Sequence, residues 1–216
     1  MRDIYHEHLD EILVEVERMT HVVSTAVRRS TNALLTADLG TAEEVIAADA
    51  QLDVAGETVE GKIFELMALQ APVAIELRML VAALRMVADL ERMGDLAAHI
   101  AKITRLRYPA AAIPDELQGV IEDMGRVAQR MVDQAGDVIK TKDVSAAQRI
   151  EATDDQMDKL RRSQFRQMMD ASWPHGVEVA VDLALLGRYY ERIADHAVSM
   201  AQRIIFLVTG EMPAAQ

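Results

Sequence analysis

"DLERMGDLAAHIAKI", residues 89–103, carries Glu91 and Asp95 four residues apart inside a long apolar-rich run. One helical turn aligns the two carboxylates, and like charges at this spacing destabilise an isolated helix by about 0.2–0.5 kcal/mol. A near copy, "YYERIADHAVSMAQRI" at residues 189–204, repeats the acidic pair one hundred residues later. The duplication predicts an internal repeat, and it indicates that some interaction offsets the cost of the paired charges.

A second alignment supports the repeat. A shift of 105 residues places "DLGTAEEVIAADAQLD", from Asp38, over "DVSAAQRIEATDDQMD", from Asp143, with six identities in sixteen positions. Internal repeats of this kind are typical of a structural unit that is used twice. The sequence therefore predicts two tandem three-helix units, at residues 1–108 and 115–209, followed by a tail at 210–216.

Amino-acid composition, including the small number of glycine and proline residues, favours an all-α protein. Half of the residues are apolar, only 4% are aromatic, and the ten glycines and five prolines leave long stretches of helix-forming residues. Thr41 with Glu44 forms a potential capping box, and Asp143 is a good cap for a later helix. Short connections between long helices predict antiparallel neighbours. The expected helices span residues 3–37, 41–69, 72–107, 115–140, 143–171 and 176–208.

Charge and cysteine usage narrow the classes of function. The net charge of −12 disfavours binding to nucleic acid or to an anionic membrane surface. The longest uncharged run, Leu66 to Ile75, is too short to span a bilayer, and the N-terminus has no apolar segment typical of a secretory signal. Because the chain has no cysteine, any metal would be bound by oxygen or imidazole ligands.

Each predicted unit has two acidic pairs at helical spacing, on its second and third helices. They could simply be solvated surface acids. Alternatively, the two pairs of one unit converge into four carboxylates, a ligand set that suits Mg²⁺, Mn²⁺, Fe or Zn²⁺. Gly94 favours the second interpretation, because a glycine within a helix indicates close approach by another helix or a ligand. The candidate metal ligands are Asp49, Asp53, Glu91, Asp95, Asp154, Asp158, Glu191 and Asp195.

A metal-dependent carboxylate-bundle enzyme, a hydrolase or di-iron oxidase, is the alternative to a non-enzymatic protein. Di-iron bundles use Glu-x-x-His, but Gly94 and Ala194 stand where the histidines would be. His99 is expected to pack on the helix surface, and His196 is a candidate for hydrogen bonding to a ligand. The sequence has no glycine-rich phosphate loop and no nucleophile or zinc-protease motif, which favours a non-enzymatic function.

The stretches at residues 69–103 and 185–204 resemble the PhoU family, the phosphate-specific transport system accessory proteins. Each contains that family's E-x-x-x-D helix signature, and the first also has its Q-x-P-x-A element from Gln70 to Ala74. The resemblance implies two antiparallel three-helix bundles related by pseudo-two-fold symmetry, with metal clusters held by the acidic motifs. Arginines near the motifs are candidates for partner binding: Arg78, Arg92, Arg188 and Arg192.

The same resemblance implies a cytoplasmic negative regulator of phosphate uptake and of the phosphate-starvation two-component response. Its expected partners are the transporter ATPase (PstB), the sensor histidine kinase (PhoR) and a second copy in a homodimer, without nucleic acid and without insertion into a membrane. The halves differ at two positions near the motifs. Arg78 corresponds to Glu178 and Ala88 to Arg188, so the halves need not bind metal or partners equally.

Overall fold

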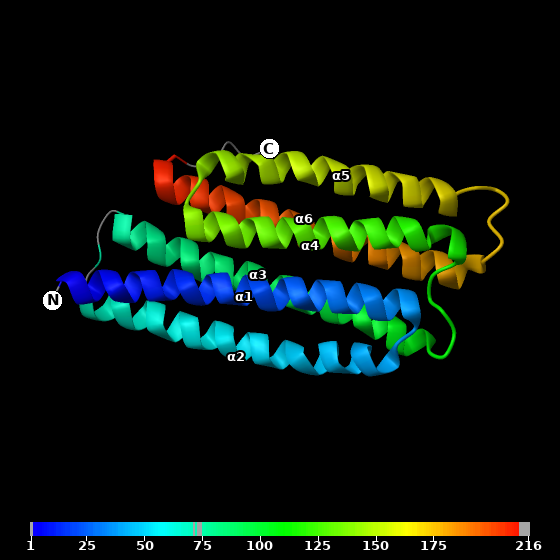
Figure 1. Cartoon of the computed structure of the whole chain (residues 1–216), viewed down its shortest axis with the longest axis horizontal. Helices are drawn as coiled ribbons and strands as arrows, with labels where there is room; N and C mark the ends of the chain where they lie inside the picture. Colours follow the sequence, from blue (N-terminus) through cyan, green and yellow to red (C-terminus); the bar gives the residue numbers. More distant parts are fainter. Residues whose placement is uncertain (1, 71, 73–74, 212–216) are drawn as a thin grey trace.

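Six α helices account for all regular secondary structure in the part of the chain that the computed structural model describes, residues 2–70, 72 and 75–211 (Figure 1). The all-α prediction is confirmed, and every helix ends within three residues of its predicted boundary. Residues 71, 73 and 74, near the predicted start of the third helix, and 212–216, most of the predicted tail, lie outside the described residues. The helices are α1 (Arg2–Thr36), α2 (Leu39–Gln70), α3 (Ile75–Arg107), α4 (Asp115–Thr141), α5 (Val144–Met168) and α6 (Gly176–Thr209).

Two helix starts test the predicted caps. The Asp143 carboxylate accepts hydrogen bonds from the backbone N–H groups of Ser145 and Ala146, as predicted. The prediction that Thr41 caps α2 is wrong. Asp38 accepts from the Thr41 backbone N–H at 3.0 Å and from its hydroxyl at 2.6 Å, so α2 begins two residues earlier. A carboxylate is charged and interacts more favourably than a hydroxyl with the positive end of the helix dipole.

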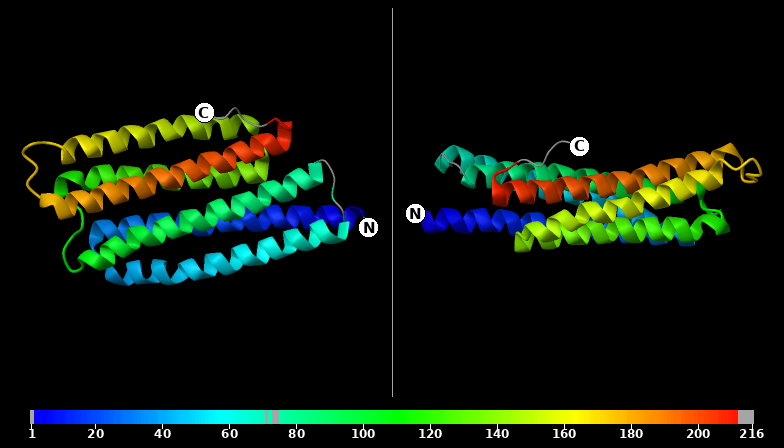
Figure 2. Two further views of the ribbon diagram at one scale, coloured as in Figure 1. Left: turned by 180° about the vertical axis from the view of Figure 1, so that it is seen from behind. Right: turned by 90° about the horizontal axis from the view of Figure 1, so that it is seen from above.

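The helices form two three-helix bundles that lie side by side. Figure 1 shows α1 next to α4 on one face, and the reverse view in Figure 2 shows α3 next to α6 on the other, with α2 and α5 on the outer sides. One hydrophobic core extends through both bundles. The two bundles therefore share buried surface through four helices, α1, α3, α4 and α6.

The contact between α1 and α4 shows the pseudo-two-fold relation of the halves. Gly125 of α4 lies against Thr31 of α1, and Gly136 of α4 lies against Thr20 of α1; at either glycine a Cβ would come within 2.5 Å of threonine side-chain atoms. The shift of 105 residues pairs Thr20 with Gly125 and Thr31 with Gly136, so the repeat exchanges the two contacts. Reciprocal contacts of this kind are typical of a two-fold interface.

Charged side chains connect α3 to α6 at one end of the interface. Arg107, the last residue of α3, donates from Nε to the buried Asp182 carboxylate of α6 at 2.5 Å and also pairs with Glu178. At the other end, the Arg78 guanidinium lies over the Phe206 ring, 5.8 Å from its centroid. One end of the interface between α3 and α6 is thus held by ion pairs and the other by a cation–π contact.

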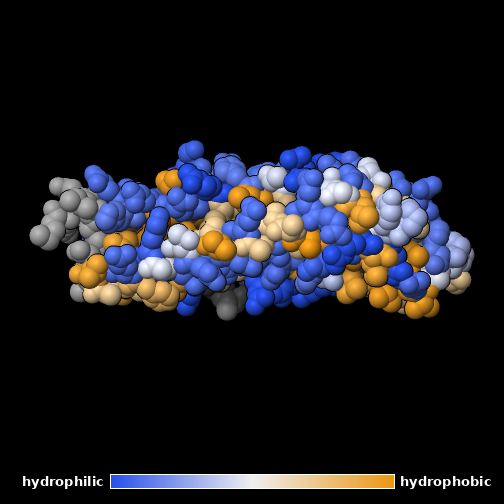
Figure 3. Space-filling view, turned by 90° about the horizontal axis from the view of Figure 1, so that it is seen from below, coloured by the Kyte–Doolittle hydropathy of each residue, from blue (hydrophilic) through white to orange (hydrophobic). Residues whose placement is uncertain are grey.

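The surface in Figure 3 is mostly hydrophilic, with apolar side chains in small groups and more of them towards one end. None of the helices within the described residues combines the length and the uninterrupted apolar character needed to cross a membrane.

Candidate metal centre

α2 and α3 pack against each other and bring together the acids predicted for the first half. The close approach predicted at Gly94 is confirmed, because a Cβ there would overlap the Leu52 side chain and lie 3.1 Å from Asp49 Oδ1. The α2 backbone can therefore pass close to the α3 turn that bears the acidic pair. The acids on the two helices are Asp49 and Asp53 of α2 and Glu91 and Asp95 of α3.

Gly56 is a second close contact, which the sequence did not single out. The Glu91 carboxylate lies where a Cβ of residue 56 would be, so no larger residue fits there unless Glu91 moves. Glu91 makes no hydrogen bond or ion pair with another described residue, whereas Asp95 is paired with the exposed Arg92 at 3.3 Å. Glu91 is thus a half-buried carboxylate without an ion-pair partner among the described residues.

The acids of α2 and α3 lie close enough to change each other's protonation. Burial, followed by repulsion from Asp95 and Asp53, raises the pKa of Asp49. Burial, followed by repulsion from Glu60 and Asp53, raises the pKa of Glu91. A bound proton or a bound cation would relieve this repulsion.

α5 and α6 repeat the arrangement in the second half with Asp154, Asp158, Glu191 and Asp195. Burial, followed by repulsion from Asp195 and Asp158, raises the pKa of Asp154 to about 6. Burial and then Glu191 raise the pKa of Asp195. In both halves, therefore, acids of two different helices repel each other.

The two acidic groups differ in their compensation by arginine. In the second half, Glu191 pairs with Arg161 and with Arg188, each at 2.5 Å. The repeat places Gly56 at the position of Arg161 and Ala88 at the position of Arg188. The first half lacks both guanidinium groups, and burial with repulsion from neighbouring acids raises the pKa of its glutamate, Glu91.

Carboxylate oxygens fit hard cations in kind and in charge, and the mutual repulsion in the first half favours cation binding. Among the described residues, however, no three Asp, Glu or His side chains already surround one point. A cation would therefore require side-chain rotation around Asp49, Asp53, Glu91 and Asp95. Metal binding by the eight acids stays a prediction.

The two histidines near the motifs have structural partners. His99 lies against the Tyr189 ring, with centroids 5.4 Å apart. Nδ1 of His196 is 3.0 Å from Oδ1 of Asp89, a buried acid of α3 that also accepts from Nε of Arg203 at 2.9 Å. His196 therefore connects the two bundles, a role that the sequence did not indicate.

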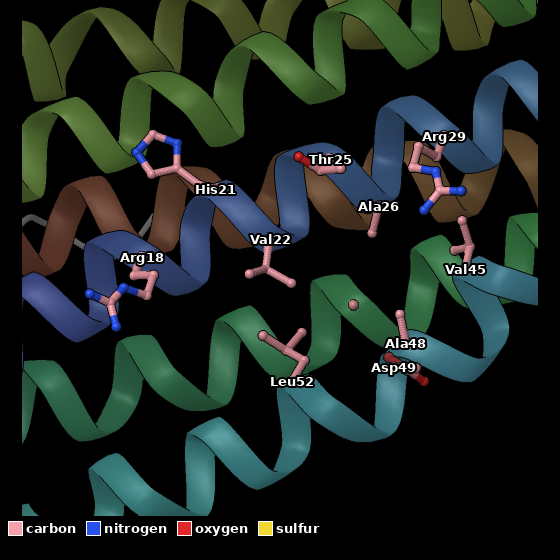
Figure 4. A pocket seen from close by; sticks show the side chains of 11 residues that line it. Arg18, His21, Val22, Thr25, Ala26, Arg29, Val45, Ala48, Asp49 and Leu52 are labelled. Atoms are coloured by element: carbon pink, nitrogen blue, oxygen red, sulfur yellow. The ribbon is translucent and has the colours of Figure 1, made fainter.

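Two hollows border the first-half acids. On one side, Asp49 and Gly94 lie in a groove of about 370 Å³ between α1 and α2, across which Val22 and Leu52 face each other in Figure 4. On the other side lies a cleft of about 440 Å³ between the bundles, which we call the interbundle cleft. It is lined by Asp53, Arg85, Ala88, Asp89, Glu91, Arg92, Asp95 and Arg203.

The arginines predicted to bind partners are mostly engaged within the chain. Arg92 pairs with Asp95, Arg188 pairs with Glu191, and Arg78 stacks on Phe206. Arg192 is exposed and makes no hydrogen bond or ion pair with another described residue. Their contact with partners stays a prediction.

Replacing Asp154 with asparagine should stabilise the protein in a pH-dependent way. The pKa of an aspartate in the unfolded chain is near 3.8, whereas the pKa of Asp154 in the fold is about 6, so the folded chain binds more protons between these values. The destabilisation by this residue grows as pH rises through that window. Allowing for solvent screening, we expect the variant to gain about 1 kcal/mol near pH 7 and nothing below about pH 4.

Urea denaturation of the metal-free protein at several pH values measures this difference. Asp137→Asn, an exposed change on α4, is the matched control and should give a small difference at every pH. An equal gain for Asp154→Asn at low and neutral pH would contradict the assignment to a shifted titration.

Comparison with known proteins gives matches over the whole chain. The family model described as PhoU domain matches residues 16–104 and 121–204, once in each half. The "Phosphate-specific transport system accessory protein PhoU homolog 2" of Mycobacterium tuberculosis is 46% identical over 213 residues, which cover 99% of this chain and 100% of the relative. Homolog 1 of Mycobacterium leprae is 45% identical, over 99% of this chain and 96% of the relative.

Two crystal structures share the fold. The phosphate transport system regulatory protein PhoU from Streptococcus pneumoniae superposes with a TM-score of 0.88 at 23% identity, covering 98% of this chain and 100% of that one. PhoU from Pseudomonas aeruginosa gives 0.83 at 25% identity, covering 96% and 100%. The predicted architecture of two three-helix bundles is thereby confirmed.

Proposed function

The chain belongs to the PhoU family, and on this premise we propose that it is an accessory protein that regulates a phosphate transport system. The observation that carries the proposal is 46% identity over 99% of the chain to a relative named as an accessory protein of that system. Both halves contribute, since the family model matches each of them. The names of these relatives, accessory and regulatory, favour a non-enzymatic role.

The proposed direction of regulation is negative. The protein would act in the cytoplasm to lower phosphate uptake and to keep the phosphate-starvation response switched off when phosphate is abundant. It would do so by contacts with the transporter ATPase (PstB) and the sensor histidine kinase (PhoR), and would itself form a homodimer. The net charge of −12 supports protein partners with basic surfaces rather than nucleic acid.

Deleting the gene tests this role. We expect phosphate uptake to rise and phosphate-starvation genes to stay expressed in phosphate-rich medium, and we expect a plasmid copy to reverse both effects. Mycobacterium tuberculosis has two relatives, homolog 1 and homolog 2, so any second family member should be deleted as well. Unchanged uptake and expression in the strain that lacks all family members would overturn the regulatory proposal.

The second part of the proposal is cation binding, and it favours the first half. Its acids repel each other, and Glu91 has no arginine partner among the described residues, while Glu191 is paired with two arginines. A divalent or trivalent ion, Mg²⁺, Mn²⁺, Fe or Zn²⁺, would neutralise this charge and could connect the carboxylates to an anionic partner. Asp49, Asp53, Glu91 and Asp95 are the proposed ligands.

A further inference from the structure

The interbundle cleft contains guanidinium groups as well as acids. Arg78, Arg85 and Arg92 are spaced by seven residues on α3 and so lie on one face of that helix. Arg85 and Arg92 line the cleft, and Arg85 makes no hydrogen bond or ion pair with another described residue. An exposed, unpaired arginine beside acidic side chains is available to an incoming anion.

Arg203 of α6 completes the basic side of the cleft. Its Nε donates to Oδ2 of Asp89 at 2.9 Å, and its Nη2 lies 2.8 Å from the same oxygen as an ion pair. Asp89 is buried and also bonded to His196. These contacts fix the guanidinium plane and leave other N–H groups of Arg203 without a partner among the described residues, because a guanidinium has five donors. Arg203 is thus held in place before any ligand arrives.

The charges in the cleft favour an anion only when a cation is present. Four carboxylates and three guanidinium groups line it, so the fully ionised cleft has one net negative charge. A divalent cation on the acids would make the cleft net positive and would leave the arginines free to receive oxygen atoms. A phosphoryl group suits such a site, because its oxygen atoms can bind guanidinium groups as well as hard cations.

From this geometry we propose that the interbundle cleft binds a phosphoryl group together with a divalent cation. The carboxylates of Asp53, Glu91 and Asp95 hold the cation, and Arg85 and Arg203 bind the phosphoryl oxygens. The proposal rests on the cation binding proposed above, and it adds the class of ligand. The group is either free orthophosphate or the terminal phosphoryl of a nucleotide, since a volume of about 440 Å³ admits both.

Arg85 and Arg203, the proposed phosphoryl ligands, have no arginine counterpart across the repeat. The repeat places Leu185 at the position of Arg85 and Ile103 at the position of Arg203. Leu185 is an exposed apolar residue and Ile103 is buried in the core. Anion binding of this kind is therefore expected at one place per chain.

Calorimetry on the full-length, metal-stripped protein tests the coupling. Mn²⁺ is titrated in buffer adjusted with sodium chloride, then at matched ionic strength with orthophosphate, and then with ADP, and protein-free titrations are subtracted. We expect orthophosphate or ADP to tighten Mn²⁺ binding roughly tenfold, within the range typical of coupled sites. The anion that produces the effect identifies the source of the phosphoryl group.

Arg85→Gln should remove most of this enhancement, with Mn²⁺ affinity in chloride buffer unchanged or slightly higher. Arg28→Gln is the matched control, because Arg28 is exposed on α1, makes no hydrogen bond or ion pair with another described residue, and does not line the cleft. It should keep the full enhancement.

Two results overturn the inference while leaving cation binding intact: Mn²⁺ binding that neither anion tightens, or an enhancement that Arg85→Gln retains. Absence of Mn²⁺ binding in every buffer overturns both the inference and the proposed cation binding. The regulatory role is judged separately by the gene deletion.

Discussion

Changing Gly125 to valine is expected to lower the free energy of unfolding by about 2–3 kcal/mol, the cost typical of overpacking in a tight core. A Cβ at residue 125 would lie 2.5 Å from Cγ2 and 2.6 Å from Oγ1 of Thr31. Thr31 cannot rotate freely, because its hydroxyl bonds to the Val27 carbonyl at 2.8 Å and to the Tyr190 hydroxyl at 2.9 Å. The two bundles would therefore have to separate locally. Urea denaturation measures the loss.

Gly119 provides a matched control on the same helix. It is exposed, and outside its own helical backbone and chain neighbours no atom of the described residues lies within 4 Å of the position of its Cβ. Gly119→Val should therefore change stability little. Adding Thr31→Ala to Gly125→Val removes the clashing atoms and should recover part of the loss. Equal effects of the two valine substitutions would show that α1 and α4 do not approach each other as closely as the structure indicates.

Exchanging the compensating residues between the halves is expected to exchange their cation affinities. Gly56→Arg with Ala88→Arg introduces the two arginines that Glu191 has as partners, and Glu91 must move to admit a side chain at residue 56. The pair should weaken cation binding by the first half roughly tenfold or more, because Glu91 is displaced and guanidinium groups compete with the ion. Arg161→Gly with Arg188→Ala frees Glu191 and should add a binding event in the second half. Calorimetry with Mn²⁺ counts the events and gives their affinities.

Ala47→Arg is the control for added charge. Ala47 is exposed on α2 and lies nine residues before Gly56, on the opposite side of the helix. This variant should keep the wild-type affinity, and circular dichroism should show helical folding in all of the variants. If both exchanges leave Mn²⁺ binding as in the wild type, the acidic groups are not the ligands.

Local signals account for what the sequence predicts well. Helical periodicity and proline positions are properties of neighbouring residues, and the repeat can be found by aligning the sequence with itself. Together they predict six helices with boundaries within three residues of those observed. Gly94 could be interpreted because glycine destabilises a helix interior, so its presence there indicates that a larger side chain would not fit. The error at Thr41 arose because two polar residues three positions apart, Asp38 and Thr41, both suit a cap, and the choice depends on backbone geometry at the turn.

Parts of the candidate site could not be predicted from local signals. The contrast between Gly56 and Arg161 appears three residues beyond the aligned segment, so a longer alignment would have found it. The contacts of Asp89 with His196 and Arg203 join positions 107 and 114 residues apart. They depend on how α3 crosses α6, which is a property of tertiary packing rather than of any motif.

The reciprocal glycine and threonine contacts between α1 and α4 bear on the origin of the molecule. Had the ancestor been a single three-helix unit, the same contacts would have joined two copies, and every substitution would have appeared on both sides at once. Gene duplication followed by fusion removes that constraint. Arginine could then arise at position 161 while glycine stood at position 56, so the covalent link allows two nearly identical units to acquire different chemistry.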